Sequence, residues 1–383
     1  MPSVYFAGLR SDTNLGDIVI IESTERLYKD AFKGKGDFLF ECLNLQFSGL
    51  NFWERVVRKL KREAFKLLNI DRTNFELNLL KNYYKKQLNN PGLIVLVGGG
   101  LIKYKYQNFF LYLTALIDIA EKKGVPLVIN AAGVEGYDEY DPRCQLLKKS
   151  LNKNIVRSIT TRDDLETLKN KYIKKENQNH INKVADSAVY CNEVYQIKKK
   201  KSAVFGIGLV RGNIFLDNER DFGPEKVIDF YVNLIKEMEE RELSFQLFTN
   251  GYSGDSELAS DIAKKLGRQE LNVIEPNKDE ELVETISSFT TVIAARLHAN
   301  IISYALDIPS IGLVWNDKLT LFGEDIGYPE RFFEYDKLDA SNIINAALVA
   351  NKQGYEPTFR QSYRKTAKNN IQDIVNKWLL GKL

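Results

Sequence analysis

The 383-residue chain has only three cysteines and two histidines, and these low counts exclude several kinds of site. Cys42, Cys144 and Cys191 lie far apart, and no Cys-x-x-Cys pair occurs. A disulfide framework or a zinc knuckle needs cysteines that are paired or closely spaced. We therefore expect three reduced thiols packed in the core, and neither a structural disulfide nor a metal site.

Long hydrophobic runs are also lacking. No apolar stretch approaches the roughly eighteen residues of a membrane span, and the first residues, MPSVYFAGLRSD, have neither a basic region nor an apolar core of the kind found in a signal peptide. We expect a cytoplasmic protein. Local lysine clusters leave peripheral association with the inner face of the membrane open.

An excess of one charge is absent as well. Fifty-four Lys and Arg residues balance fifty-one Asp and Glu residues, for a formal net charge of +3. The strong basic field of a dedicated nucleic-acid binder is therefore missing, and we expect no nucleic-acid partner. The length and the 44% hydrophobic content favour two domains. Nothing in the sequence defines an oligomeric state.

The first half of the chain alternates short apolar runs with amphipathic stretches. The expected helices include residues 16–32, 108–124 and 163–172. The expected strands are VYFAGL (4–9), DFLFECLNL (37–45), LIVLVGG (93–99), LVINAAG (127–133), VRSITT (156–161) and part of NKVADSAVY (182–190). Strands that are apolar on both faces and separated by helices indicate a parallel sheet covered on both sides.

The same alternation restarts after YQIKKKKS (195–202), whose four lysines suggest a linker. Further strands are expected at AVFGIGLV (203–210), SFQLFTN (244–250), NVIEP (272–276), TTVIAA (290–295) and SIGLVW (310–315). The fold class is thus α/β, with two doubly wound, Rossmann-like domains facing a cleft, at 1–195 and 196–383. A closing helix is expected at 357–380.

Residues 50–90 depart from this pattern and form a Lys/Arg-rich helical insertion in the first domain. Its aromatic side chains are Trp53, Phe65 and Tyr83. One interpretation is a solvated helical face over buried aromatics; the other is a lid or a platform for a sugar or an anionic lipid surface.

Ligands of doubly wound domains bind outside the carboxyl ends of the strands. Arg296 and His298 lie where a strand ends and a helix begins, in AARLHANIISYAL (294–306). A helix N-terminus favours an anion, and arginine offers a planar set of donors to phosphate or carboxylate. His298 is either a structural histidine or a general acid and base. His180 lies in a polar loop and is assigned no role.

Two further cations follow strands of the second domain. Arg211 comes just after the first strand in FGIGLVRGN, and Lys318 follows the strand that ends at Trp315. Both can add charge to a pocket for a small, doubly anionic ligand. For Lys318 the alternative is an ordinary surface lysine on an exposed turn.

The first domain has candidate loops of its own. Asn14, Gly16 and Asp17 form the turn NLGD at the start of a helix, and Gly99 and Gly100 belong to VGGG after a strand. VGGG is neither a dinucleotide fingerprint nor a P-loop, so what remains is close approach of the backbone to a ligand or simply a tight turn. Arg162 leaves a strand in TTRDD, where the two aspartates suit helix caps.

NLGD, VGGG, TTRDD, VADSA (184–188) and above all RLHANIISYALDIPSIGLVWNDK (296–318) together resemble the polysaccharide pyruvyl transferase family. The resemblance extends from the first strand to Gly327. It implies a two-domain fold like that of the GT-B glycosyltransferases, and transfer of pyruvate from phosphoenolpyruvate onto a sugar as a ketal. This chemistry requires no cofactor and no metal.

The resemblance also implies roles for single residues. Arg296 and His298 match the family's Arg-x-His motif, Lys318 matches its following lysine, and Arg211 and Arg162 match arginines of the family more loosely. The chemistry adds His298 as proton carrier and Asp17 as a group that orients or deprotonates an acceptor hydroxyl. The alternative for Asp17 is a helix cap.

The sequence departs from the family's pattern in three places. Ser187 replaces a usual proline, Asn130, Ala131 and Ala132 replace a glutamine-glycine turn, and residues 50–90 have no recognised counterpart. The acceptor, a sugar or a lipid-linked glycan, is therefore the part of the resemblance that transfers least. The alternatives are a glycosyltransferase of the same fold that uses a nucleotide sugar and a non-catalytic carbohydrate-binding protein.

Overall fold

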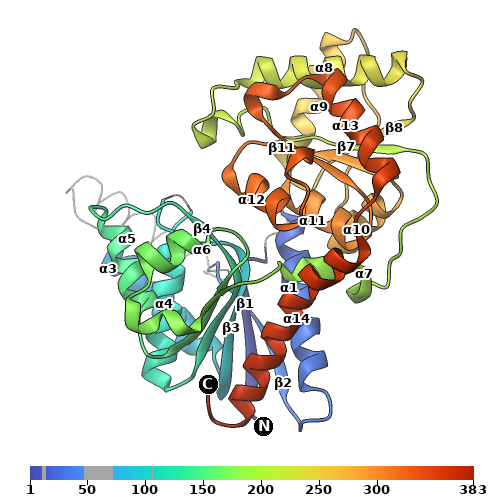
Figure 1. Ribbon diagram of the computed structural model, residues 1–383. Coiled ribbons are helices and arrows are strands. Elements are labelled where there is room, and N and C mark those ends of the chain that lie inside the picture. Colours follow the sequence, from blue (N-terminus) through green and yellow to red (C-terminus); the bar gives the residue numbers. More distant parts are fainter. Residues whose placement is uncertain (11–13, 47–71, 106) are drawn as a thin grey trace. The chain divides into compact units, whose positions relative to one another are not determined.

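The computed structural model describes residues 1–10, 14–46, 72–105 and 107–383, which pack into two compact units (Figure 1). The first unit comprises the described residues of Met1–Arg10, Tyr28–Val184 and Asn370–Leu383. The second unit comprises those of Ser11–Leu27 and Ala185–Asn369. Each unit has its own sheet and its own hydrophobic core.

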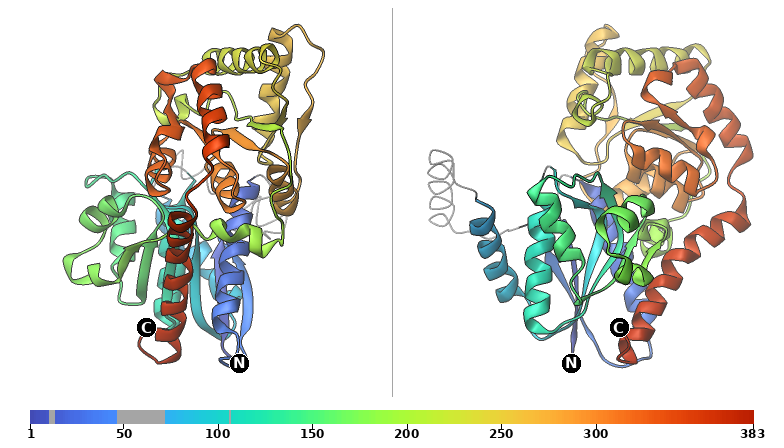
Figure 2. Two further views of the ribbon diagram at one scale, coloured as in Figure 1. Left: turned by 45° about the vertical axis from the view of Figure 1, so that its right-hand side comes forward. Right: turned by 60° about the vertical axis from the view of Figure 1, so that its left-hand side comes forward.

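The sheet of the first unit has six parallel strands in the order β2-β1-β3-β4-β5-β6. They are β1 (Ser3–Gly8), β2 (Leu39–Asn44), β3 (Pro91–Lys103), β4 (Leu127–Glu135), β5 (Val156–Thr161) and β6 (Ile181–Lys183). The central strands are buried along nearly their whole length, because helices cover both faces of the sheet (Figure 2).

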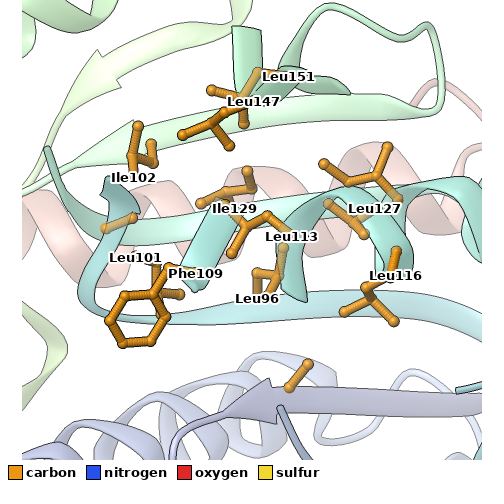
Figure 3. Packing of buried hydrophobic residues seen from close by; sticks show 14 of the residues in the cluster. Leu96, Leu101, Ile102, Phe109, Leu113, Leu116, Leu127, Ile129, Leu147 and Leu151 are labelled. Atoms are coloured by element: carbon orange, nitrogen blue, oxygen red, sulfur yellow. The ribbon is translucent and has the colours of Figure 1, made fainter. Parts of the chain in front are cut away.

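Helices of the first unit include α3 (Thr73–Gln87), α4 (Phe109–Lys123), α5 (Pro142–Leu151) and the short α6 (Leu165–Thr167), which continues as a wider turn over Leu168–Tyr172. Asp141 begins α5 by accepting a hydrogen bond from the backbone N–H of Arg143, and a proline occupies the first turn. Figure 3 shows the core between sheet and helices, formed by side chains of β3, β4, α4 and α5: Leu96, Ile129, Leu113, Leu116, Leu147 and Leu151.

The second unit has another six-stranded parallel sheet, in the order β12-β11-β10-β7-β8-β9. Its strands are β7 (Phe205–Gly208), β8 (Phe245–Phe248), β9 (Val273–Ile274), β10 (Thr291–Ala294), β11 (Ser310–Val314) and β12 (Phe332–Glu334). Its helices include α7 (Cys191–Val194), α8 (Pro224–Glu240), α9 (Ser253–Lys265), α10 (Asp279–Ser287), α11 (Leu297–Ala305), α12 (Asp317–Asp325) and α13 (Ala340–Gln353).

Two helices contribute to both units, namely α1 (Leu15–Phe32) and α14 (Pro357–Leu379). In the second unit, Nε of Arg364 on α14 donates to the carbonyl of Val189 at 2.9 Å. In the first unit, the indole of Trp378 donates to the carbonyl of Gly92 at 3.1 Å and packs edge-on against Phe32 of α1. The helix expected at 357–380 is therefore present as α14.

Several strands differ from the sequence-based expectation. The predicted end of a strand at Gly99 is wrong, because β3 continues to Lys103 and pairs Ile102 with Val134 of β4. The register shifts after Gly99, whose φ is +82°, so the glycines form a bulge within the strand. Of the run 182–190 only the start belongs to β6, since residues 187–190 form a 3₁₀ turn. Strand β12 was not predicted.

The units also differ from the expected division at residue 195. The chain passes from the first unit to the second after Val184, residues 14–27 belong to the second unit, and Asn370–Leu383 return to the first. The four lysines expected in a linker belong to the second unit and are exposed, and the backbone N–H of Lys200 donates to the carbonyl of Ser287 at 2.8 Å. Of the insertion expected at 50–90, residues 50–71 lie outside the described residues and Thr73–Gln87 forms α3.

The cysteines follow the expectation in part. Cys144 and Cys191 are buried free thiols, whereas Cys42 is exposed. The expectation of a core position for Cys42 is wrong because β2 is an edge strand of its sheet, and half of its residues, Cys42 included, are exposed.

Candidate functional site

Three of the predicted cations follow neighbouring strands of the second sheet. Strand β10 pairs with β7 on one side and β11 on the other, with Ala294 opposite both Gly208 and Gly312. Arg211, Arg296 and Lys318 follow β7, β10 and β11 in turn. Because all these strands are parallel, the three loops leave the sheet at one carboxyl edge, as the sequence predicts.

The guanidinium of Arg296 is oriented by a carboxylate that the sequence analysis missed. Nε of Arg296 donates to Oδ2 of Asp255 at 2.8 Å, and Nη2 donates to Oδ1. The backbone N–H of Arg211 also donates to Oδ1 of Asp255, at 2.9 Å. Asp255 has no exposed surface and lies in the first turn of α9. It thereby connects the loops that follow β7, β8 and β10.

The loop that carries Arg296 is held from two further sides. The side-chain amide of Asn300 donates to the carbonyls of Ala294 and Arg296 at 3.1 and 3.0 Å. The indole of Trp315, after β11, donates to the carbonyl of Ala295 at 2.6 Å. The backbone between strand β10 and helix α11 is therefore fixed at the point where Arg296 leaves it.

The other arginines of this edge also have carboxylate partners. Nη1 of Arg211 lies 2.5 Å from Oδ2 of Asp217, and Nη2 of Arg220 lies 2.5 Å from Oδ1 of Asp317, the residue before Lys318. The carboxyl edge of the sheet thus carries aspartates beside its arginines, whereas the sequence pointed to the cations alone. Carboxylates at these positions restrict the directions in which the guanidinium groups can offer donors to a ligand.

The start of α1 belongs to the same unit as His298, although the sequence analysis placed it in the other domain. The amide of Asn14 donates to Oδ2 of Asp17 at 2.8 Å, and the N–H of Asp17 donates to the carbonyl of Asn14 at 3.1 Å. Gly16 lies directly against His298, which is only 9% exposed. The structure therefore brings together Arg296, His298, Asn14, Gly16 and Asp17 within one compact unit.

A second buried side chain near the end of β8 was also missed. Asn250 is 2% exposed, and neither its amide oxygen nor its amide nitrogen has a hydrogen-bond partner among the residues that the structure describes. A buried amide without partners is costly, so groups of this kind mark places where a ligand or water is expected. Asn250 and Asp255 both follow β8, so their place at this edge is predictable from the sequence, whereas the bond of Asp255 to Arg296 is not.

Burial raises the pKa of Tyr231, on α8, far above its ordinary value, and the charge of Asp255 adds to this effect. The phenol therefore stays protonated and donates to the carbonyl of Gly208 at 2.9 Å, at the end of β7. It supports the strand that precedes Arg211 from within the core. Within the described ranges, no three His, Cys, Asp or Glu side chains are grouped so that they could hold a metal ion.

The remaining predicted residues, Gly99, Gly100 and Arg162, belong to the first unit. Arg162 follows β5 and is 7% exposed. Its neighbour Asp163 has a structural role, because Oδ1 accepts from the N–H of Val134, the hydroxyl of Thr161 and the N–H of Asp164 at 2.7–2.9 Å. Asp164 caps α6 by accepting from the N–H of Thr167, as the sequence suggests for these aspartates.

The described part of the chain contains no helix long and apolar enough to span a membrane. A comparison with curated proteins finds no match. Solved structures with a similar fold include the UDP complex of MnaA from S. aureus, with a TM-score of 0.57 and 11% sequence identity over 100% of this chain and 98% of that one. UDP-GlcNAc 2-epimerase from Methanocaldococcus jannaschii has a TM-score of 0.58 and 14% identity over 98% of this chain and 100% of the other.

At these identities the likeness concerns the fold alone, which is α/β, has two domains and is GT-B-like, as expected. A comparison with models of protein families, by contrast, identifies a family. The model of the polysaccharide pyruvyl transferases matches residues 14–317, which include the NLGD turn, both candidate loops of the first unit and the segment from Arg296 to Asp317. The chain therefore belongs to the polysaccharide pyruvyl transferase family.

Proposed function

We propose that the protein transfers pyruvate from phosphoenolpyruvate to two hydroxyl groups of a sugar, forming a ketal and releasing phosphate. The observation that carries this proposal is that Arg296 and His298 both follow strand β10. Buried Asp255 fixes Arg296, and His298 packs on Gly16 of the NLGD turn. Family membership supports a polysaccharide pyruvyl transferase in general, and the donor and the ketal are our extension.

The donor is small and carries a phosphate and a carboxylate. Arg296, Arg211 and Lys318 leave three neighbouring parallel strands at one edge, and we assign them to these two anionic groups. Arginine suits planar, bidentate recognition of both, and oriented donors stabilise the charge that develops in the transition state. The buried carboxylate of Asp255 holds Arg296 in a fixed direction, and the more exposed Asp217 pairs with Arg211.

Ketal formation needs two new C–O bonds at the same carbon, the first made by addition to the double bond and the second by displacement of phosphate. A proton goes to the methylene carbon of the donor, while the first sugar hydroxyl forms a C–O bond at the adjacent carbon and loses its proton. The second hydroxyl then displaces phosphate from that carbon, and its proton leaves with the phosphate. His298 is the group we assign to proton transfer, and Asp17, in the same unit, orients or deprotonates a hydroxyl. The steps require no redox or metal cofactor.

The acceptor is a sugar or a lipid-linked glycan, and besides Asp17 we assign Arg162, Gly99 and Gly100 to its recognition. Arg162 follows β5, and Gly99 and Gly100 form the bulge of β3, where backbone without side chains can approach a ligand closely. An acceptor on a lipid carrier would place the protein at the inner face of the membrane in the cell.

The experiment follows phosphoenolpyruvate by phosphorus and proton NMR during incubation with a panel of sugars and lipid-linked glycans. Acceptor-dependent release of phosphate, together with a new ketal methyl signal, is the expected result. Consumption of a nucleotide sugar, with phosphoenolpyruvate unchanged across the panel, would overturn the proposal in favour of a glycosyltransferase. If neither reaction occurs but a sugar binds saturably, the protein is a non-catalytic one of the same fold.

A matched pair of variants tests the assignment of His298. His298→Gln keeps a side chain of similar size but cannot carry the proton, so turnover is expected to be lost while the thermal midpoint changes little. His180→Gln alters the other histidine of the chain, which is exposed in the first unit, and should leave turnover unchanged. Full activity of the His298→Gln variant would remove the assigned role.

A further inference from the structure

The contact between Gly16 and His298 is closer than any side chain at position 16 would allow. Gly16 is the second residue of α1, and His298 is the second residue of α11. A Cβ atom at position 16 would lie 2.5 Å from both Cβ and Cγ of His298, and closer still to Nδ1. Real Cβ atoms essentially never approach a neighbour within 3.0 Å, so glycine is required for this arrangement.

Rotation of the histidine side chain cannot make room for a larger residue. Rotation about the Cα–Cβ bond moves the ring, but Cβ of His298 keeps its place unless the backbone of α11 moves. That backbone is held by the amide of Asn300 on the carbonyls of Ala294 and Arg296, and by the indole of Trp315 on the carbonyl of Ala295. A methyl group at position 16 must therefore displace the start of α1, the ring, or both.

The start of α1 is fixed on the second unit by an independent contact. Leu15 is 1% exposed and packs on Gly251, where a Cβ atom would lie 2.6 Å from both Cγ and Cδ1 of Leu15. Gly251 has a φ of +82°, a conformation that favours glycine. Two glycines thus let the first turn of α1 approach two loops of the second sheet, one after β8 and one after β10.

We propose that Gly16 is a positioning residue for His298, and that the first turn of α1 is the wall against which the imidazole is held. Gly16 would then serve the site through its backbone and through the lack of a side chain, and not by contact with the donor. The effect on turnover rests on the proposed function, whereas the effect on the histidine does not. A misplacement of about 1 Å can lower a rate about 100-fold, which sets the expected size.

The first test observes the histidine directly. The chain has two histidines, so ¹³C labelling at histidine Cε1 in protein without a histidine tag gives two signals, which His180→Gln assigns. Gly16→Ala should change the chemical shift of His298 and leave that of His180 in place. Gly223→Ala is the matched control, because a Cβ there meets only Leu216, at 3.6 Å, and it should change neither signal. An unchanged His298 signal in folded Gly16→Ala protein would overturn the proposal.

The second test measures turnover of phosphoenolpyruvate with an accepted sugar. Gly16→Ala should lower kcat about 100-fold with little change in KM for the donor, because the cations that hold it are left in place. A rise in KM with kcat unchanged would mean instead that Gly16 contacts the donor. If the wild type has no such activity but the His298 signal moves, the proposed function fails and the positioning role stands.

A third variant keeps the test valid if Gly16→Ala does not fold. His298→Gly removes every atom that a methyl at position 16 is shown to meet. The Gly16→Ala, His298→Gly double variant should therefore melt close to His298→Gly alone, whereas Gly16→Ala alone melts lower than wild type. If Gly16→Ala lowers the melting temperature equally in wild-type and in His298→Gly protein, its effect does not arise from the contact with His298, and the proposal is overturned.

Discussion

The guanidinium of Arg296 donates two hydrogen bonds to the carboxylate of Asp255, a side chain with no exposed surface, while Arg296 itself keeps about a fifth of its side-chain surface exposed. The carboxylate of Asp255 is thus fully buried, whereas part of the Arg296 side chain remains accessible to solvent. Such a pair is a means of aiming a cation, since a buried ion pair adds little net stability but is costly to break.

We expect Asp255→Asn to lower both stability and turnover. Removing one partner of a buried pair leaves an uncompensated charge, which costs about 3 kcal/mol of the free energy of unfolding. Because Arg296 also loses its orientation, kcat/KM for phosphoenolpyruvate should fall about 100-fold. Urea unfolding and NMR turnover assays measure the two effects. Asp217→Asn is the control for stability, because both side chains of the Arg211–Asp217 pair are more than a third exposed and the pair should contribute less than about 1 kcal/mol. Equal losses of stability would contradict this account.

The three thiols should differ sharply in reactivity. Cys42 is exposed, whereas Cys144 and Cys191 are buried. Burial raises the pKa of Cys191 to about 12, and the nearby Arg364 offsets only part of this shift. At pH 8 this thiol is below its pKa and stays protonated, and the thiolate is the reactive form. Iodoacetamide should therefore label Cys42 first in native protein, as peptide mass spectrometry would show. Labelling of Cys191 as fast as Cys42 would contradict the described fold.

The two neighbouring aspartates after β5 should contribute unequally to stability. Asp163 is buried and accepts three hydrogen bonds through one oxygen, including one from β4, so Asp163→Ala should cost about 3 kcal/mol. Asp164 caps a short helix, and Asp164→Ala should cost about 1 kcal/mol. Urea denaturation measures both. Similar costs for the two variants would mean that Asp163 does not hold β4 and β5 together.

Most strands could be predicted because they are short apolar runs, and the pattern failed where distant residues decide the structure. The glycines at 98–100 predict the end of a strand, yet β3 continues because β4 extends beside it to Glu135. Strand β4 is itself irregular, with Ala131 at a φ of +50° and its N–H bonded to the hydroxyl of Thr160. These contacts depend on the order of strands in the sheet, which local propensity does not contain.

In the candidate site, too, some residues could be predicted from the local sequence and others could not. Arg296, Lys318 and Arg211 could be located because each follows a recognisable strand, and the carboxyl ends of parallel strands share an edge. Asp255 looks like an ordinary residue of a first helical turn, and its bond to Arg296 becomes visible only once β7 is known to lie between β8 and β10. Gly16 follows a strand of the first sheet in the sequence, but packs on His298 in the second unit.

The last prediction concerns the end of α14, which belongs to the first unit. The ring of Trp378 packs against Phe32 and Phe38 at centroid distances of 5.6 Å, and its N–H donates to the carbonyl of Gly92. Trp378→Ala removes all three contacts, and because the side chain is half-buried we expect a loss of about 2 kcal/mol in the free energy of unfolding.

Trp378→Phe separates the two kinds of contact. It keeps an aromatic ring against Phe32 and Phe38 but cannot donate to Gly92, so about 1 kcal/mol should be lost. Urea denaturation followed by circular dichroism measures both variants independently of tryptophan fluorescence. Helix α14 begins in the second unit, and its residues from Asn370 on belong to the first. In Trp378→Ala protein, protease should therefore cleave the helix first beyond Asn370, where the contacts of Trp378 are lost. Cleavage that begins nearer Pro357 would show that the contacts of Trp378 do not hold this end of the helix.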